Sequence, residues 1–300
     1  MSYRRDRWDT PDGDFVDVDW TLPRAASVRS AENAHPNAPL VVVFHGLEGG
    51  STSHYAHALM WRVRESGWNG AVVHFRGCSG EPNRLPRAYH SGDSAEIDWV
   101  LRRLRAGRDG AMYVAGVSLG GNALLKWLGE QSAAATAIVA RAAAVSAPLD
   151  LMSAGDALGR GFNLVYTRAF LSTLKRKSIA KLGAHPGLYD AARVRASRTL
   201  REFDDVVTAP LHGFRDTDDY WTRASSKPWL KSIAVPTLVV NARNDPFLPQ
   251  SALPSARDAA SCVTLEFPGD GGHVGFVSGA FPGHLDWLPR RIIGFFRDAR

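Results

Sequence analysis

Short, uninterrupted apolar runs that alternate with helical patterns constrain the fold of this chain more than any other feature. The runs are Leu40–Phe44, Ala71–Phe75, Met112–Val117, Ala142–Ser146 and Thr237–Asn241, with Cys262–Phe267 as a weaker sixth. A strand that is apolar at every position is buried on both faces. Helical patterns lie between the runs, and one of them begins at a capping-box-like pair, Asp93 and Glu96, and closes at Gly107. This alternation predicts right-handed crossovers and a mainly parallel sheet with helices on both faces.

The first twenty residues predict an antiparallel hairpin ahead of that sheet. Arg4–Thr10 and Asp14–Trp20 flank a Pro-Asp-Gly turn. In the second segment, valines alternate with Asp17 and Asp19, and this period of two predicts an edge with one solvated face. The polar stretch Pro23–Pro39 predicts a loop.

One long interval interrupts the alternation of strands and helices. From about Pro148 to Lys231, more than eighty residues carry helical patterns and no convincing core strand. Loops of that length without structure of their own are uncommon in compact domains, so the interval predicts a helical cap inserted into the sheet domain. The predicted class is α/β, with residues 1–147 and 232–300 as the core and 148–231 as the cap.

The predicted cap carries an apolar stripe and an uneven distribution of charge. Phe162, Tyr166 and Phe170 share one face of a basic helix, where they either line an acyl pocket or pack inside the cap. Six basic and no acidic residues lie between Ala157 and Tyr189, whereas Arg201–Trp221 is acidic. The two segments predict internal charge matching, and the basic helix also offers a peripheral contact for anionic lipid headgroups.

The pentapeptide Gly116-Val-Ser118-Leu-Gly120 matches the pattern G-x-S-x-G. It ends a predicted strand and opens the helix-prone run Asn122–Glu130. At such a strand-to-helix elbow the central residue takes a positive φ and its side chain projects from the sheet, which predicts Ser118 as a nucleophile. A glycine-rich packing turn is the alternative reading of this motif.

A serine nucleophile requires a histidine base and an orienting carboxylate, which follow it in the order acid, then histidine, in this type of fold. Asp245 follows directly on a predicted strand, at the carboxyl edge of the sheet, and His273 lies in a glycine-rich loop after the last strand. These positions predict both partners. Asp270 is the alternative acid, and His284 and His212 are the alternative bases.

An oxyanion site is predicted in the glycine-rich segment His45–Gly50, directly after the first apolar run. Small residues let the backbone approach a substrate carbonyl, and the N–H groups of Leu47 and Leu119 would donate to its oxygen. A glycine-rich turn without this role is the alternative.

No metal, cofactor or disulfide framework is predicted. The two cysteines, Cys78 and Cys262, do not fall in zinc-binding spacings, and Cys78 is expected to be a structural residue near the site. His45, His54 and His57 are close in sequence, but no cysteine or carboxylate completes a metal spacing.

Composition excludes several classes of function. The net charge is +6, but the chain has no basic stripe with stacking aromatic residues, so no nucleic-acid partner is expected. The most apolar window, Ala133–Met152, is interrupted by Arg141, which argues against an integral membrane segment. No secretory pattern follows Met1–Arg7, and the expected location is therefore the cytoplasm.

Seven motifs, taken together, resemble one branch of a known family. They are Pro39–Gly50, His74–Asn83, Tyr89–Gly92, Gly116–Asn122, Arg201–Asp205, Asn244–Phe247 and Gly271–Phe276. Over roughly residues 10 to 297 the chain is similar to the YheT-like α/β-hydrolases, the AB hydrolase 4 group, which includes bacterial esterases and ABHD1/ABHD3-type lipases. This resemblance implies Ser118, Asp245 and His273 as the charge-relay triad and activity on short- to medium-chain acyl esters.

The function expected from residues and resemblance is a serine carboxylic ester hydrolase that acts on a small-molecule or lipid-like ester. An acyltransferase or a phospholipase with the same triad is an alternative, and a non-catalytic binding protein with the hydrolase fold is an alternative of another class. Dehalogenases and epoxide hydrolases of this fold require aspartate at the position of Ser118 and are set aside.

Overall fold

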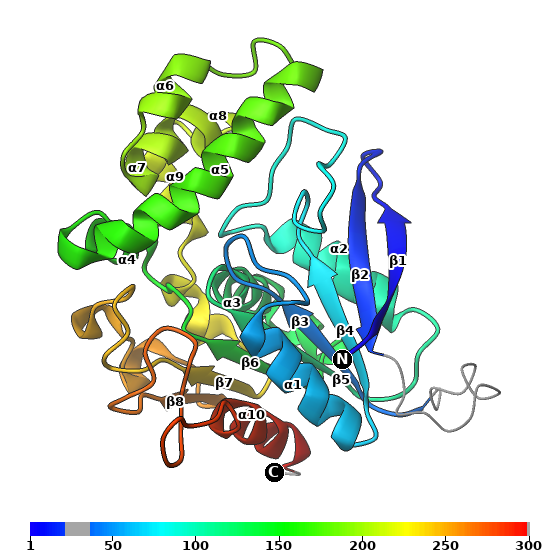
Figure 1. Cartoon of the computed structure of the whole chain (residues 1–300). Helices are drawn as coiled ribbons and strands as arrows, with labels where there is room; N and C mark the ends of the chain where they lie inside the picture. Colours follow the sequence, from blue (N-terminus) through cyan, green and yellow to red (C-terminus); the bar gives the residue numbers. More distant parts are fainter. Residues whose placement is uncertain (22–36, 299–300) are drawn as a thin grey trace.

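An eight-stranded sheet forms the centre of the computed structural model, which describes residues 1–21 and 37–298 (Figure 1). Its spatial order is β1-β2-β4-β3-β5-β6-β7-β8. The strands are β1 (Tyr3–Asp9), β2 (Phe15–Thr21), β3 (Leu40–Phe44), β4 (Asn69–His74), β5 (Met112–Val117), β6 (Arg141–Val145), β7 (Thr237–Val240) and β8 (Val263–Glu266). The β1–β2 and β2–β4 pairs are antiparallel and the other pairs are parallel, which confirms the predicted fold class. The predicted loop Pro23–Pro39 lies almost entirely outside the described residues.

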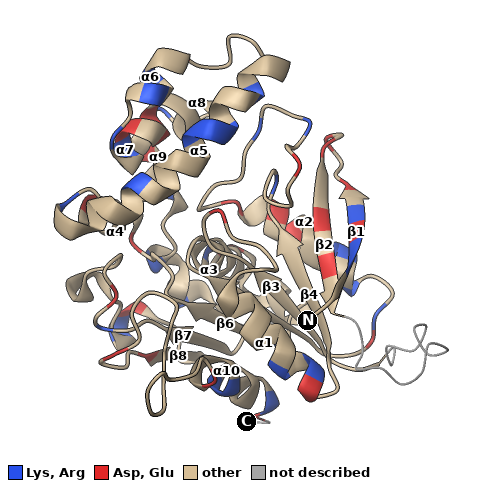
Figure 2. Cartoon of the chain, in the orientation of Figure 1, with Lys and Arg blue, Asp and Glu red and all other residues tan. Residues whose placement is uncertain are grey.

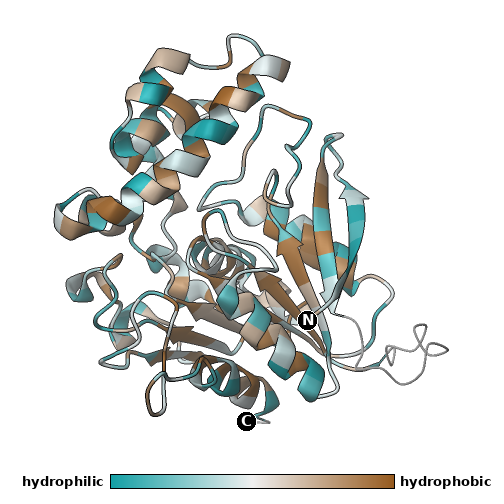
Figure 3. Cartoon of the chain, in the orientation of Figure 1, coloured by the Kyte–Doolittle hydropathy of each residue, from teal (hydrophilic) through white to brown (hydrophobic). Residues whose placement is uncertain are grey.

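Helices cover both faces of the sheet. Two of them, α1 (His54–Glu65) and α10 (Trp287–Arg297), pack on one face, and α2 (Ser94–Arg105) and α3 (Leu119–Gln131) pack on the other. In β3, Val41 and Val43 belong to the first of these cores, whereas Val42 belongs to the second. Successive side chains of a strand point to opposite faces, so an apolar residue is needed at every position of β3. Figure 3 shows the resulting hydrophobic strands.

The N-terminal hairpin forms as predicted, but its solvated face does not. Asp17 and Asp19 of β2 are buried. Arg7 of β1 binds Asp17 through two nitrogens at 2.8 and 2.9 Å, and Arg5 binds Asp19 at 2.7 and 2.8 Å. Because β2 also pairs with β4, it is an inner strand, and its carboxylates are neutralised by the outer strand instead of by water.

The start of α2 also differs from the prediction. Asp93 occupies the N-cap position, but its carboxylate makes no capping hydrogen bond and instead binds the guanidinium of Arg87 at 2.5 Å. Glu96 binds the guanidinium of Arg76, also at 2.5 Å. Both carboxylates are buried, and a buried charge requires a partner of opposite sign more strongly than a helix end requires a cap.

The segment between β6 and β7 consists of helices joined by short turns and contains no strand. It comprises α4 (Leu151–Leu158), η2 (Gly161–Asn163), α5 (Leu164–Ala184), α6 (Ala191–Ala196), α7 (Leu200–Phe203), the π-helical turn η3 (Asp204–Thr208), α8 (Ala209–Leu211), α9 (Thr217–Ala224) and η4 (Lys227–Ser232). Residues 148–231 are called the cap below. In Figure 1 its helices lie beyond the carboxyl ends of the central strands.

The two segments that connect the cap to the sheet domain lie side by side. The N–H of Lys227 donates to the carbonyl of Leu149 at 2.9 Å, so the segments that enter and leave the cap are hydrogen-bonded to each other. The N–H of Leu151 donates to Ser225 Oγ at 2.9 Å one step further in. The short helices η1 (Ser132–Ala137), η5 (Gln250–Ala252) and η6 (Ala256–Asp258) complete the described structure. None of the described helices has the length and apolar character needed to cross a membrane.

The predicted charge matching inside the cap is wrong. Within the described residues, no ion pair joins the basic segment around α5 to the acidic segment 201–221. The acidic residues pair with nearby arginines such as Arg215 and Arg223, whereas Lys177 of α5 pairs with Glu48 of the sheet domain. Figure 2 shows charged residues of both signs on the cap helices. Neighbours in sequence on short helices reach each other more readily than residues on opposite sides of the cap.

Candidate active site

Ser118 lies at a sharp turn between β5 and α3. It has a φ of +53°, a conformation that non-glycine residues seldom adopt and that projects the side chain from the carboxyl edge of the sheet. A Cβ added to Gly116 would lie 2.5 Å from the carbonyl oxygen of Gly120, and one added to Gly120 would lie 2.5 Å from the carbonyl oxygens of Phe44 and His45. The two glycines are therefore required by close backbone packing around the serine.

The structure brings the other two predicted side chains to this serine. His273 Nε2 lies 2.9 Å from Ser118 Oγ, and His273 Nδ1 lies 2.9 and 3.1 Å from the two carboxylate oxygens of Asp245. Asp245 is buried, and its Oδ1 accepts the backbone N–H of Phe247 at 2.8 Å. The ring of Phe247 packs on that of His273, with centroids 4.1 Å apart. A hydroxyl, an imidazole and a carboxylate thus form one continuous hydrogen-bonded chain.

The alternative residues lie elsewhere. Asp270 is exposed, and its Oδ1 accepts from Asn244 Nδ2 at 3.1 Å. His284 is exposed in the loop before α10 and pairs with Ser278. Both ring nitrogens of His212 lie 2.8 Å from backbone carbonyls. None of these three groups contacts Ser118 or His273.

The loop after β3 approaches the serine closely and presents one free N–H. A Cβ added to Gly46 would lie 3.1 Å from Ser118 Cβ. The N–H of Gly46 donates to Tyr55 Oη at 2.8 Å, and the N–H of Glu48 donates to Tyr89 Oη at 2.8 Å. Among the hydrogen bonds of the described residues, the N–H of Leu47 between them has no acceptor.

Leu119 supplies a second free N–H on the other side of the serine. It is the first residue of α3, and the first N–H groups of a helix have no acceptor within the helix. The positive end of the α3 dipole adds to their attraction for a negative oxygen. The two backbone donors predicted from the sequence therefore flank Ser118, and neither has an acceptor within residues 1–21 and 37–298.

His45 supports the loop from below. It is fully buried, and burial lowers its pKa to about 3, so the ring is neutral. Its Nδ1 lies 2.7 Å from the carbonyl of Gly46, and its Nε2 accepts the N–H of Phe75 at 3.1 Å. This pattern uses the proton of a neutral imidazole on one side and its lone pair on the other, and it fixes the strand-to-loop junction.

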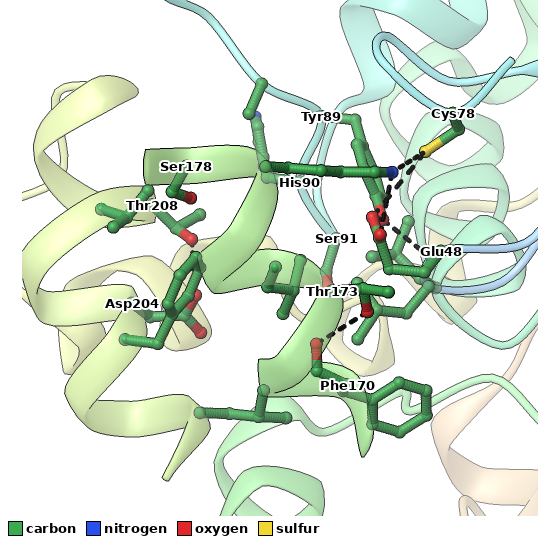
Figure 4. A pocket seen from close by; sticks show the side chains of 18 of the residues that line it. Glu48, Cys78, Tyr89, His90, Ser91, Phe170, Thr173, Ser178, Asp204 and Thr208 are labelled. Carbon is green, nitrogen blue, oxygen red and sulfur yellow. Dashed lines mark hydrogen bonds and ion pairs between the residues drawn. The ribbon is translucent and has the colours of Figure 1, made fainter. Parts of the chain in front are cut away.

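A cavity of about 710 Å³ lies between the serine and the cap. Its wall includes Ser118, His273, Leu47 and Leu119. One face of α5 contributes Phe170, Thr173, Leu174, Lys177, Ser178 and Lys181. These residues recur at spacings of three and four, as expected for a single helical face. Figure 4 shows Asp204 and Thr208 on one side of the cavity and Glu48, Cys78 and Tyr89 on the other.

Only one of the three predicted cap aromatics lines this cavity. Phe170 contributes to its wall, whereas Phe162 and Tyr166 do not. Phe162 belongs to η2, before α5 begins, and is 78% exposed. Tyr166 is one turn before Phe170, and its ring packs on Phe247 at a centroid distance of 5.0 Å. The predicted stripe is therefore only partly correct. Phe162 precedes the helix, Tyr166 is partly exposed beside Phe247, and Phe170 alone of the three reaches the cavity.

Cys78 lines the cavity, and burial raises its pKa to about 12. A neutral thiol is a weak nucleophile, and no histidine contacts it among the described residues. His45, His54 and His57 do not gather, and within 1–21 and 37–298 no group of three potential ligands is placed to hold a metal ion.

Comparison with known proteins agrees with this geometry. Residues 39–280 match the family model described as the alpha/beta hydrolase fold. The chain belongs to the α/β-hydrolase family. It is 41% identical, over 95% of its length and 82% of the relative's, to the YheT protein of Escherichia coli (strain K12), which is named as an esterase. It is also 30% identical to the phospholipase ABHD3 of Mus musculus, over 97% of this chain and 70% of that protein. The YheT-like resemblance seen in the sequence is confirmed.

Solved structures of this α/β-hydrolase family share the fold at low sequence identity. The ferulic acid-bound Est1E of Butyrivibrio proteoclasticus aligns with a TM-score of 0.59 and 15% identity, covering 99% of this chain and 98% of that chain. An identity this low supports the shared architecture and carries no argument about substrate.

Sequence reasoning did not identify three residues that shape the site. The hydroxyls of Tyr55 and Tyr89 hold the N–H groups on either side of Leu47, and the ring of Phe247 covers His273. Tyr89 and Phe247 lie in motifs that carry the family resemblance, but no spacing in the sequence shows which backbone group a tyrosine will reach. Tyr55 had no distinguishing signal.

Proposed function

We propose that this protein hydrolyses carboxylic esters of short- to medium-chain acyl groups through an acyl-enzyme on Ser118. The observation that carries the proposal is the chain of hydrogen bonds from Ser118 Oγ through His273 to Asp245, at 2.9 Å on each side of the imidazole. Such a chain makes the serine hydroxyl nucleophilic, because the imidazole accepts its proton as the new bond forms.

The reaction proceeds in two steps. Ser118 Oγ attacks the ester carbonyl while His273 Nε2 takes the hydroxyl proton, and Asp245 stabilises the imidazolium that forms. The tetrahedral intermediate collapses, and His273 returns the proton to the departing alcohol. Water then attacks the acyl-enzyme with the same base, and release of the carboxylic acid regenerates the free serine.

The backbone N–H groups of Leu47 and Leu119 would stabilise the negative oxygen of each tetrahedral intermediate. Their support is that each lacks a protein acceptor and flanks the serine. Loss of one donor of this kind costs about 2.7–4 kcal/mol of transition-state stabilisation.

The cavity supports a substrate with an apolar acyl group. Leu151, Leu158, Phe170, Leu174 and Leu211 line it together with the serine. A cavity of about 710 Å³ falls within the range of small-molecule sites. The names of the relatives, an esterase and a phospholipase, agree with acyl esters as the class.

The test is labelling with a fluorophosphonate probe, followed by hydrolysis of p-nitrophenyl esters of increasing chain length. We expect labelling of the wild type, loss of labelling in Ser118→Ala, and a maximum of kcat/KM at short to medium chains. Equal labelling of both proteins would reject Ser118 as the nucleophile, and a fully unreactive wild type would favour a binding protein. Ethanol added to the ester assay separates hydrolysis from acyl transfer, because a transferase forms the ethyl ester.

Exposed hydrophobic residues beside the cavity support a peripheral lipid contact. Phe162 and Val165 are 78% and 52% exposed. Phe162 packs on Tyr166, Tyr166 packs on Phe247, and Phe247 packs on His273, so an exposed apolar surface is continuous with the candidate base. Arg168, also on α5, is exposed and would attract anionic headgroups, and this surface would deliver lipid-like esters to the serine.

Vesicle sedimentation tests the lipid contact. The double variant Phe162→Ser/Val165→Ser should bind vesicles of phosphatidylcholine and phosphatidylglycerol about tenfold more weakly, because two apolar side chains no longer enter the bilayer. Trp61→Ser is the matched control, since Trp61 is an exposed aromatic residue of α1, which packs on the sheet away from the cap. Equal loss in both variants, or no loss in either, would contradict the contact.

A further inference from the structure

Glu48 directly follows the proposed oxyanion donor Leu47 and has an unusual backbone. Its φ is +56°, in the left-handed region that seldom holds a non-glycine residue. Its N–H donates to Tyr89 Oη at 2.8 Å, and the hydroxyl of Tyr89 donates to Glu48 Oε1 at 2.8 Å. Tyr89 thus restrains both the backbone N–H and the side chain of Glu48. Because Leu47 directly precedes Glu48, its backbone is restrained as well.

Tyr89 is itself fixed by its surroundings. Its ring stacks on Phe75, with centroids 5.4 Å apart and planes 7° from parallel, and His45 packs edge-on against it. Burial raises the pKa of Tyr89 well above its ordinary value, so its hydroxyl keeps the proton that it donates to Glu48. These contacts hold the side chain of Tyr89 in a fixed position on the sheet domain.

The second oxygen of the Glu48 carboxylate reaches the cap. Lys177 Nζ of α5 lies 2.8 Å from Glu48 Oε2, and the side chain of Glu48 is only 9% exposed. Within the described residues this is the sole ion pair between α5 and the sheet domain. Cys78 Sγ lies 3.8 Å from the same Nζ, but its raised pKa leaves it uncharged, so the carboxylate is the counter-ion of Lys177.

We propose that Glu48 is a positioning residue for the oxyanion site and that Lys177 makes its effect depend on the cap. The proposal rests on the function proposed above. With α5 in its observed place, the lysine holds the carboxylate against Tyr89, and Tyr89 holds the Glu48 peptide so that the Leu47 N–H faces the serine. When α5 moves away, the carboxylate loses its cationic partner and the donor loses a restraint. Stabilisation of the oxyanion is thereby coupled to closure of the cap over the substrate.

Steady-state kinetics on a soluble p-nitrophenyl ester test this coupling. Lys177→Met removes the charge but retains the length of the side chain, and Glu48→Gln keeps an acceptor for Tyr89 but loses the ion pair. Both variants should lower kcat about tenfold and leave KM within about twofold, because a misplaced donor acts on the transition state and not on ground-state binding. Lys177→Arg restores the ion pair and should restore kcat to within about twofold of the wild type.

Two controls separate coupling from general damage to the cap. Lys175, two residues before Lys177, binds the backbone carbonyls of Arg195 and Ser197 inside the cap and does not line the cavity. Lys175→Met should therefore retain wild-type kcat. The double variant Glu48→Gln/Lys177→Met should be no slower than the slower single variant, since both substitutions remove the same interaction.

Each further outcome overturns the coupling. If Lys177→Met has the kcat of the wild type, the ion pair has no role in the reaction. If KM rises and kcat is unchanged, Lys177 binds substrate and does not position the donor. If Lys177→Arg is as slow as Lys177→Met, or the double variant is additive, the effect is not carried by the pair. Failure of the proposed function is read separately, from a wild type that neither hydrolyses esters nor reacts with the fluorophosphonate.

Discussion

The carboxyl edge of the sheet and the cap meet across one cavity, but they are built differently. Ser118 lies beside strands whose side chains are almost completely buried, and backbone contacts of 2.5 Å would exclude a Cβ at Gly116 or Gly120. In contrast, the 21 residues of α5 bury only Thr167, Leu171 and Ser178. The sheet edge leaves no freedom to the groups around the serine, whereas the cap helix touches its surroundings with a minority of its side chains.

This difference assigns separate tasks to the two regions. Chemistry that depends on tenths of an ångström belongs on the sheet edge, where neighbouring strands fix each loop. Selection among substrates tolerates looser walls and belongs to the cap. The Glu48–Lys177 ion pair crosses this boundary, which is why it is the feature that we propose as the link between them.

The largest expected effect comes from a substitution at the carboxyl edge of the sheet. Asp245→Asn should lower kcat about 10⁴-fold with little change in KM, because the amide no longer holds His273 in the tautomer that accepts the serine proton. Asp270→Asn is the matched control in the neighbouring loop and should leave kcat unchanged, since its carboxylate contacts Asn244 and not His273. Steady-state kinetics of both variants decide between the two acids. A large loss in Asp270→Asn alone would reverse the assignment.

Substitution of one glycine in each region tests how tightly the two regions are packed. Gly120→Ala should lower the free energy of unfolding by about 3 kcal/mol or more, because its Cβ would meet two backbone carbonyls that cannot move aside. Gly183→Ala in α5 should raise it by up to about 1 kcal/mol, because nothing lies within 4 Å of the new methyl group and alanine favours the helix. Urea unfolding measures both. Equal effects would contradict the proposed contrast in packing.

Buried carboxylates in the two regions should make the free energy of unfolding depend on pH in different ways. Burial raises the pKa of Asp204, in the cap, to about 6, so the folded protein binds a proton that the unfolded chain has lost between about pH 4 and 6. As the pH rises through that range, the free energy of unfolding therefore falls by about 2–3 kcal/mol for this group. Asp204→Asn should make the free energy of unfolding fall less than in the wild type, measured as the difference in urea unfolding between pH 4.5 and 7.

Asp19, a buried carboxylate of the sheet domain, has a pKa shift of the opposite sign. Arg5 and His74 beside Asp19 hold the pKa of that carboxyl below its ordinary value, so its contribution is present at neutral pH and is lost only below about pH 4. Asp109→Asn is the control for Asp204→Asn, since Asp109 is exposed. An Asp204→Asn variant with the same pH dependence as the wild type would show that this carboxyl does not titrate in that range.

The smallest expected effect concerns selectivity. Phe170→Ala enlarges the cavity on the cap side, and the ratio of kcat/KM for long over short acyl esters should rise about tenfold, since a few methylenes gain room. Phe281→Ala is the control, because Phe281 is completely exposed. An unchanged ratio in Phe170→Ala would place the acyl group elsewhere in the cavity.

The sheet could be predicted from the sequence because buried strands leave a direct signal. The apolar runs lie within two residues of β3 to β8, since most side chains of β3 to β7 are buried. The spatial meeting of Ser118, Asp245 and His273 was also predictable, because each follows a strand at the same edge of the sheet. Their catalytic role stays a prediction.

The remaining features depend on contacts between segments that are distant in the sequence. The alternation in β2 indicated a wet face, but Arg5 and Arg7 cover Asp17 and Asp19 because β2 is an inner strand. Spacing within α5 indicated an apolar stripe, but not where the cavity ends along it. The helices of the cap are partly exposed, and all but α5 are short, so neither their partners nor their charge pairs follow from local pattern.

The hydrogen bond between Leu149 and Lys227 brings the two ends of the cap segment together at one point of the sheet domain. The chain leaves the sheet domain and returns to it at neighbouring positions. The residues between these two positions can therefore be lengthened, shortened or replaced without shifting the strands. A chimera that exchanges the intervening residues between two relatives should have the substrate selectivity of the relative that supplies the cap and the reaction of the relative that supplies the sheet domain. Diversification of this enzyme class then needs recombination at two sites and no redesign of the nucleophile.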